Sequence, residues 1–459
     1  MCIVCQTAAV GATFLAGVLP VDFGSVESRR EPAPAVAMPS RSVPTRAGTA
    51  CTSIGSTTTH KKQSLVCRKV GKRLIWTKTA APARTTTTTV PPTTSGSFAP
   101  DAICADKETS RSQYWQVSAG FPKFARRIAS TGTVRVLMLP VDFPDAVASG
   151  SPTTDMLPIT RAISDVFGNL SNGTLSFDFA TLPSYLRVSK ESTWWGMGSW
   201  GTGRGDSYVA DIVRELDPQV DFTNIDVVVV MAPPTIRSNQ IAYSPAMPYP
   251  DIAPLVTAER SIYSSTMTGA DAWSNPMTIV HEFGHLLGWV DTYVLPFPAG
   301  PYEDGHHFTG KWDFMGYAWT KGLFGWHRFW QGWLEDAEIL CVNSTGDVTT
   351  TLAPLGATTK TPELLLMRGT SGKLVAVEVR RPGPMDEFVS AATQGVLVYT
   401  IDADLPTGKG PLRVQGISLS RADYLATAPL KPGQSITVDG WTITVNSSDS
   451  SGDTIRATR

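Results

Sequence analysis

The spacing of hydrophobic and polar positions changes several times along the chain, and these changes outline its organisation. Two runs are almost continuously aliphatic, VRVLMLPVDF at residues 134–143 and IDVVVVM at residues 225–231. Such runs are typical of strands that are buried on both faces. The stretch between them that follows Pro158 has helical spacing. Its predicted buried side comprises Ile159, Ile163, Val166, Phe167 and Leu170.

After residue 341 the pattern changes to short strands: LLLMRG, KLVAVEVRR, GVLVYTID and SITVDGWTITV. The Gly, Pro and Asp residues between them predict turns. We therefore expect a β-rich C-terminal domain over residues 342–459, after a domain of mixed helices and strands over residues 101–341. The predicted fold class is α+β.

The first hundred residues contain no pattern that predicts a large core. Residues 1–37 have the features of an export segment, because AAVGATFLAGVLP is similar in length and character to a signal-peptide core and Ala35-Val36-Ala37 could be cleaved. The preceding MCIVCQT lacks the usual Lys or Arg. Residues 38–50 are predicted to be a flexible lead-in, and residues 79–100 a Thr/Pro-rich linker.

Residues 51–78 are predicted to form a small disulfide-paired basic module. Its second half contains two short strands, SLVCRK and RLIWTK, joined in a hairpin around Gly71. A segment this short cannot bury a core of its own, so it needs a disulfide to hold its shape. Its C…G…C…G…L.W pattern resembles a small basic module that recurs in exported proteins of actinobacteria.

Charge is distributed unevenly, although the formal total is only −1. Residues 32–100 contain ten Lys and Arg and no Asp or Glu, and residues 1–31 carry −1, which leaves −10 for residues 101–459. The basic residues between 41 and 84 are either a solvated face or a contact for the cell wall or another anionic polymer. They lie outside the main domain, so we do not expect nucleic-acid binding.

The cysteines favour an exported protein. Two of the six, Cys2 and Cys5, lie in the predicted export segment. Of the remaining four, Cys51 and Cys67 bracket the small module and are expected to pair, which leaves Cys104 and Cys341 as a long-range disulfide. The alternative is four free thiols in a reducing compartment. No later stretch of about 20 apolar residues exists, so no membrane-spanning helix is expected. We expect the protein to be secreted or associated with the cell wall.

Five of the six histidines lie between positions 281 and 327. His281 and His285 are four residues apart in HEFGHLLGWVD, in a helix whose start is predicted at Asn275 and Pro276. Both imidazoles therefore project from one side of the helix, one turn apart, and can share a zinc ion. Glu282 lies beside the first ligand, where it can act as general base on a water rather than bind the metal.

Gly288 is predicted to end this helix, because glycine adopts a positive φ at no steric cost. The chain can then return Asp291 to the metal as the third ligand, which leaves one position open for water. The loop that follows offers rival third ligands: Glu303, Asp304, His306 and His307.

Met315, in KWDFMGY, predicts a methionine turn that forms an apolar floor below the ligand histidines, as in metzincins. Tyr317, two residues later, either stabilises an oxyanion as a catalytic residue or simply packs. His327 lies beside Trp326 and near Trp330, and it is expected to be packed.

HEFGHLLGWVD and GKWDFMG together resemble the immune inhibitor A-type (M6) metallopeptidases, a metzincin-related family. Segments at 136–145, 166–179, 322–334 and 395–414 are similar to further parts of that family, so the resemblance spans residues 130–440. It implies a metzincin-like catalytic domain, a mixed twisted sheet with an active-site helix. Trp289 and Val290 stand where the family often has leucine and proline, which keeps the rival third ligands open.

The resemblance and the spacing together predict a secreted zinc-dependent endopeptidase, a monomer that acts on protein or peptide substrates. We expect the substrate to lie along an edge strand at residues 261–266. The alternative is a cell-surface binding or adhesion protein with a structural or vestigial zinc site. Two points stay open: whether Ca²⁺ also braces the fold, and whether Cys104 caps the zinc in a zymogen instead of pairing with Cys341.

Overall fold

The computed structural model describes residues 50, 57–60, 63–70, 72–78, 104–109, 116–343, 345–357 and 359–459. The predicted export segment and the Thr/Pro linker lie outside these residues. The described parts fall into two units, one within residues 11–97 and one that contains residues 104–459. Among the described residues, no helix combines the length and the apolar character that crossing a bilayer requires.

The smaller unit is a three-stranded antiparallel sheet of order β1-β2-β3. Its strands are β1 (Thr57–His60), β2 (Gln63–Val70) and β3 (Arg73–Lys78). The predicted hairpin is therefore confirmed, and β1 is an addition to it. Cys67 is buried and disulfide-bonded, whereas its predicted partner Cys51 lies outside the described residues.

The larger unit begins with a mixed six-stranded sheet. Four of its strands run parallel in the order β5-β4-β7-β11, the short β6 also pairs with β4, and the antiparallel β8 follows β11. The strands are β4 (Gly132–Asp142), β5 (Leu175–Thr181), β6 (Leu186–Arg187), β7 (Val227–Met231), β8 (Ala246–Pro248) and β11 (Ser264–Thr268). The two aliphatic runs form β4 and β7 as predicted, and every residue of β7 is buried.

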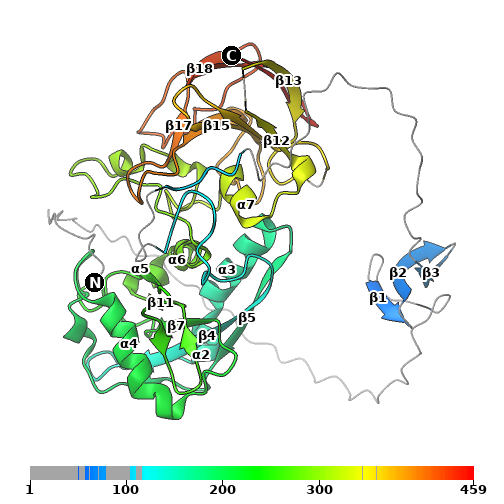
Figure 1. Ribbon diagram of the computed structural model, residues 1–459. Coiled ribbons are helices and arrows are strands. Elements are labelled where there is room, and N and C mark those ends of the chain that lie inside the picture. The colour runs from blue at the N-terminus through cyan, green and yellow to red at the C-terminus, as the bar shows by residue number, and fades with distance from the viewer. Residues whose placement is uncertain are drawn as a thin grey trace, which may run out of the picture. The chain divides into compact units, whose positions relative to one another are not determined.

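Helices cover both faces of this sheet (Figure 1). The helices α3 (Leu157–Leu170) and α6 (Met277–Leu287) pack on one face, and α4 (Gly205–Leu216) packs on the other. All five apolar residues that predicted α3 are buried in its core. The shorter elements are α2 (Pro152–Asp155), α5 (Ala270–Ser274), η1 (Ser192–Trp195), η2 (Asp217–Gln219), β9 (Leu255–Val256) and β10 (Ser261–Ile262).

The edge strand on the β11 side of this sheet is β8, not residues 261–266 as predicted. Those residues are divided between β10, which pairs with β9, and β11, which pairs with β7 on one side and β8 on the other. The prediction was wrong because AMP at residues 246–248 is too short to show a strand pattern, yet it covers the side of β11 that was expected to be free.

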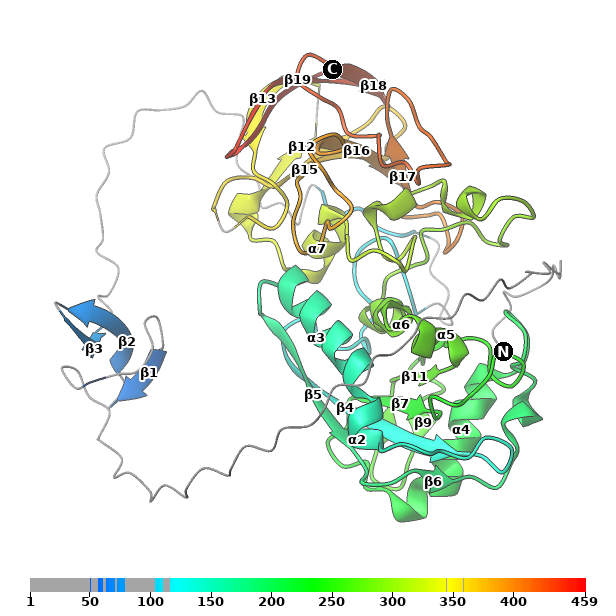
Figure 2. The same cartoon turned by 180° about the vertical axis from the view of Figure 1, so that it is seen from behind.

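The C-terminal region consists of two stacked sheets (Figures 1 and 2). One has five strands in the order β12-β14-β15-β16-β17, and the other has four in the order β13-β20-β19-β18. Leu365, Val377 and Val398 of the first meet Trp441 and Ile455 of the second in one core. The strands are β12 (Ile339–Val342), β13 (Asp347–Leu352), β14 (Leu364–Arg368), β15 (Leu374–Arg380), β16 (Gly395–Ile401), β17 (Leu412–Gln415), β18 (Ser435–Val438), β19 (Trp441–Asp449) and β20 (Gly452–Thr458).

The second face of the five-stranded sheet packs against the chain that follows α6. Trp312, Phe324 and Trp326 share a core with Leu364 and Leu397 of that sheet. This part of the chain contains η3 (Tyr302–His306), η4 (Gly310–Trp312), α7 (Gly325–Gln331) and η5 (Asp336–Glu338). The chain from 104 to 459 therefore has an α+β fold in which the β-rich part is buried directly against the region that bears the histidines.

Cys104 and Cys341 form the predicted long-range disulfide, with their Cα atoms 6.0 Å apart. The sulfur of Cys104 is therefore committed to this bond, and capping of a metal by Cys104 as a free thiolate is excluded in this state.

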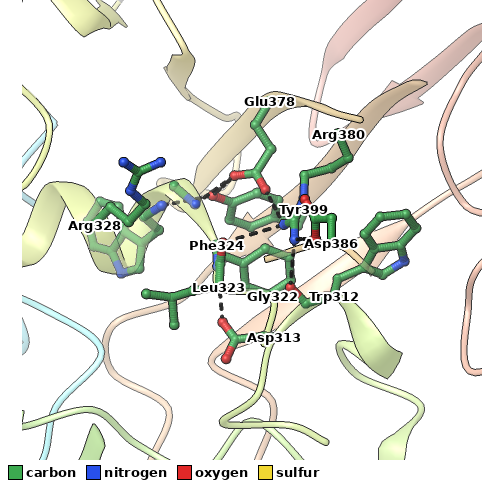
Figure 3. Close-up of polar contacts among 12 residues, drawn as sticks. Trp312, Asp313, Gly322, Leu323, Phe324, Arg328, Glu378, Arg380, Asp386 and Tyr399 are labelled. Atoms are coloured by element: carbon green, nitrogen blue, oxygen red, sulfur yellow. Dashed lines mark hydrogen bonds and ion pairs between the residues drawn. The ribbon is translucent and has the colours of Figure 1, made fainter. Parts of the chain in front are cut away.

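A buried polar network fastens the methionine turn to the five-stranded sheet (Figure 3). The Arg380 guanidinium donates to the carboxylates of Glu378 and Asp386, and it also donates to the carbonyls of Trp312 and Leu323 at 3.3 and 3.4 Å. Glu378 and Arg380 are each no more than 1% exposed. The guanidinium is thus removed from water and surrounded by oxygen acceptors, two of them carboxylates, as a buried cation must be.

Glu378 extends the network to α7. One of its oxygens accepts the backbone N–H of Gly325 at 2.8 Å and the Tyr399 hydroxyl at 2.9 Å, and that hydroxyl accepts the N–H of Trp326 at 3.0 Å. The first N–H groups of α7 have no acceptor inside the helix, and side chains of the sheet accept their hydrogen bonds instead.

Replacing Arg380 by Met should lower the free energy of unfolding by about 3–5 kcal/mol, because two buried carboxylates lose their counter-charge. Urea denaturation measures this loss. Arg456→Met is a matched control, since its ion pair with Asp347 is exposed and contributes little. A loss in the Arg380 variant no greater than that of the control would contradict the structural role of the network.

Candidate metal centre

The helix that carries HEFGH is bounded by residues suited to its ends. The Asn275 side chain accepts the N–H of Met277 at 3.1 Å, which caps the helix start next to Pro276. At the other end Gly288 has φ +105°, in the left-handed region that favours glycine. Trp289 N–H bonds back to Gly284 O at 3.0 Å, so the chain reverses there and directs Asp291 toward the two histidines.

His281, His285 and Asp291 converge on one point. Asp291 Oδ1 lies 3.2 Å from His281 Nε2 and 3.2 Å from His285 Nε2. Ligands about 2.0 Å from a tetrahedral metal ion are about 3.3 Å apart, so this spacing fits such an ion. Among the described residues, this is the one group of three His, Cys, Asp or Glu side chains whose ligand atoms approach so closely.

The other ring nitrogens of the two histidines have backbone partners. His281 Nδ1 donates to Phe314 O at 3.0 Å, and His285 Nδ1 donates to Trp289 O at 2.8 Å. Both rings donate a proton from Nδ1, and both Nε2 atoms face Asp291 Oδ1. Two ring nitrogens this close to a carboxylate oxygen need positive charge between them, which either a bound metal ion or protonation of a histidine supplies. The donor set therefore fits a divalent metal with histidine and carboxylate ligands.

The charges in the group are strongly coupled. Burial by itself would raise the pKa of Asp291, but His285 and His281 outweigh it and hold that pKa far below its usual value. Burial lowers the pKa of His285, and the Asp291 carboxylate outweighs this and raises it. Asp291 is therefore kept ionised, which is the form that binds a metal.

Three of the four rival third ligands make contacts elsewhere. Asp304 pairs with Arg421 at 3.0 Å, and its backbone carbonyl accepts His307 Nδ1 at 2.7 Å. His306 Nδ1 lies 2.6 Å from Gly316 O. None of them, nor Glu303, joins the three-residue group in the described part of the chain. The geometry favours Asp291.

The methionine turn lies directly against the helix. Met315 is fully buried, and a Cβ placed on Gly284 would come within 2.3 Å of its sulfur. The Met315 carbonyl accepts the N–H of Thr292, next to Asp291, at 3.0 Å. The turn therefore supports both the ligand helix and the segment that returns the third ligand.

Glu282 lies beside the ligands and is held by the edge strand. Ala246 N–H, on β8, donates to Glu282 Oε2 at 2.6 Å. Desolvation raises the pKa of Glu282 to about 8. Sequence reasoning did not identify Ala246, because a backbone N–H leaves no mark on the side-chain pattern.

Tyr317 and His306 belong to an aromatic cluster. The Tyr317 ring lies 5.1 Å from that of His306 and 4.6 Å from that of Tyr424. These are the contacts of a packed ring, and the oxyanion role stays a prediction. His327 is buried, with Nδ1 2.9 Å from the Asp313 carboxylate, as its predicted packed role requires.

Comparison with known protein families and with curated proteins finds no match.

Gly284→Ala should destabilise the protein by about 1–3 kcal/mol, because the added methyl group would overlap the Met315 sulfur in a filled core. The matched control is Gly168→Ala in α3, where a Cβ meets nothing within 4 Å. That change should stabilise by up to about 1 kcal/mol, since alanine favours the helix. Thermal unfolding of both variants measures the contrast, and equal effects would contradict the close packing of helix and turn.

Proposed function

We propose that this chain is a secreted zinc endopeptidase of the metzincin type, similar to the M6 metallopeptidases. The observation that carries the proposal is the convergence of two helical histidines and one carboxylate, with Glu282 beside them and not among them. Three protein ligands leave a position for water, and a group that needs no metal bond is available to move a proton. A purely structural zinc site requires neither feature.

His281, His285 and Asp291 would hold the zinc ion. When bound, it lowers the pKa of a coordinated water toward about 7 and polarises a carbonyl oxygen. The Nδ1–H bonds of the two histidines to backbone carbonyls keep their Nε2 atoms aimed at this position.

Glu282 would take the proton of the attacking water and pass it to the leaving amine. Its bond from Ala246 N–H occupies one carboxylate oxygen, Oε2, and leaves Oε1 for this transfer. The same bond fixes the rotamer of the side chain, so the proton acceptor is already oriented before substrate arrives.

The substrate would lie along β8, the exposed edge next to Glu282, instead of residues 261–266. Tyr249 N–H donates to Tyr263 O at 2.9 Å, so these two residues form a hydrogen-bonded pair between the antiparallel strands. Such pairs alternate along the strands, so the N–H and C=O of Met247 also point toward β11. The backbone groups of Ala246 and Pro248 point away from β11. Pro248 has no N–H, and the N–H of Ala246 donates to Glu282. This edge therefore offers only the carbonyls of Ala246 and Pro248, and it would bind an extended peptide through the peptide's own N–H groups.

Export is supported by the Cys104–Cys341 disulfide, since such bonds persist in oxidising compartments. The small unit carries exposed Arg68, Lys69, Lys72 and Arg73 on and beside its hairpin. This basic group supports a contact with an anionic polymer such as the cell wall. That contact would localise a peptidase and does not require an adhesion function for the whole chain.

Glu282→Gln should retain zinc and lose peptide cleavage by at least about 100-fold, because glutamine accepts the Ala246 bond but cannot take a proton. The measurement is zinc stoichiometry together with cleavage of a mixed peptide library followed by mass spectrometry. Glu303→Gln is the matched control, and it should keep both zinc and activity because Asp291 is the third ligand. Full activity in the Glu282 variant would refute the proposed mechanism.

A further inference from the structure

The segment that bears the third ligand lies against a loop of the C-terminal region. Residues 402–411 connect β16 to β17, and their central part runs beside residues 291–295. Gly408 N–H donates to Asp291 O at 3.0 Å, and Leu295 N–H donates to Gly408 O at 2.8 Å. The Lys409 ammonium donates to Leu295 O at 2.6 Å. The contact is therefore made mostly by main chain, with fixed register.

Gly408 makes this close approach feasible. Its φ is +69°, and a Cβ at this position would lie 2.3 Å from the Leu295 Cβ. Only glycine adopts this backbone conformation without strain while leaving room for the neighbouring side chain. The loop is shaped to lie against the ligand segment.

Thr407, the residue before this glycine, reaches the ligand itself. Its hydroxyl accepts the N–H of Asp291 at 2.9 Å and donates its own proton to Asp291 Oδ2 at 2.9 Å. A hydroxyl has one proton to donate, so that proton is fully used. Oδ2 is thereby committed to Thr407, whereas Oδ1 faces His281 Nε2 and His285 Nε2, each at 3.2 Å.

We infer that Thr407 is a positioning residue of the metal centre, which selects Asp291 Oδ1 as the single metal-binding oxygen and holds it in place. The inference rests on the proposed metal site. Partners of this kind orient a ligand and typically change metal affinity by about 10–100-fold when removed. The C-terminal β region then completes the metal centre from 116 residues away in the sequence.

The test compares three full-length variants. Thr407→Val keeps the shape and removes the hydroxyl, Thr407→Ser keeps the hydroxyl, and Lys409→Met alters the same loop without touching Asp291. Zinc affinity is measured by competition with a chromophoric chelator. We expect about 10–100-fold weaker binding for T407V, and affinities close to the wild type for T407S and K409M.

A second readout separates positioning from loss of structure. With Co²⁺ as the probe, T407V frees Oδ2 to join the metal, so its visible absorption should weaken as the coordination number rises, whereas the T407S spectrum should match the wild type. Metal-free T407V should unfold within a few degrees of metal-free wild type. Should T407V not fold, Thr407→Ala takes its place: weak zinc binding in T407A with wild-type affinity and spectrum in T407S would support the role of the hydroxyl, and T407S and T407A with equal affinities would overturn it.

The outcomes also separate this inference from the proposed function. A wild-type protein that binds no zinc would refute both the role of Thr407 and the proposed function. A wild type that binds zinc, with T407V equal to it in affinity and cobalt spectrum, would overturn the role of Thr407 and leave the proposed peptidase intact.

Discussion

The buried Asp313 carboxylate is the constraint on which the candidate metal centre depends. One oxygen accepts the N–H of Met315 at 2.8 Å, and the other accepts the N–H of Phe324 at 3.3 Å and lies 2.9 Å from His327 Nδ1. These bonds close the methionine turn. Within this turn, the carbonyl of Phe314 orients His281, and the sulfur of Met315 fills the space at Gly284. The arrangement of the proposed ligands thus depends on one fully buried acid outside the group of three.

The same turn joins the two parts of the larger unit. Arg380 reaches it from the five-stranded sheet through the carbonyl of Trp312, and Thr407 of the β16–β17 loop bonds Asp291, the proposed third ligand. Buried charges and short main-chain contacts allow little relative movement, because any shift would leave polar groups without partners. In the proposed enzyme, the C-terminal sheets are therefore part of the scaffold that holds the site rigid.

Much of this arrangement could be predicted because it depends on sequence patterns that span only a few residues. The buried face of α3, the aliphatic β4 and β7, the glycine at the end of α6 and the spacing of His281 and His285 all follow from patterns within a few residues. The edge strand could not be predicted, since residues 246–248 are too few to show alternation. Thr407 and the Ala246 N–H act through tertiary contacts between residues far apart in the sequence, so no local pattern identifies them.

The central claim is that three protein ligands hold one zinc ion beside a free glutamate. Anomalous diffraction at the zinc absorption edge, from crystals of the full chain grown with zinc, tests this most directly. The account predicts one strong peak at about 2.0–2.2 Å from His281 Nε2, His285 Nε2 and Asp291 Oδ1, with no fourth protein ligand. A peak coordinated by Asp304 or His306, or one closed by a fourth side chain, would contradict it.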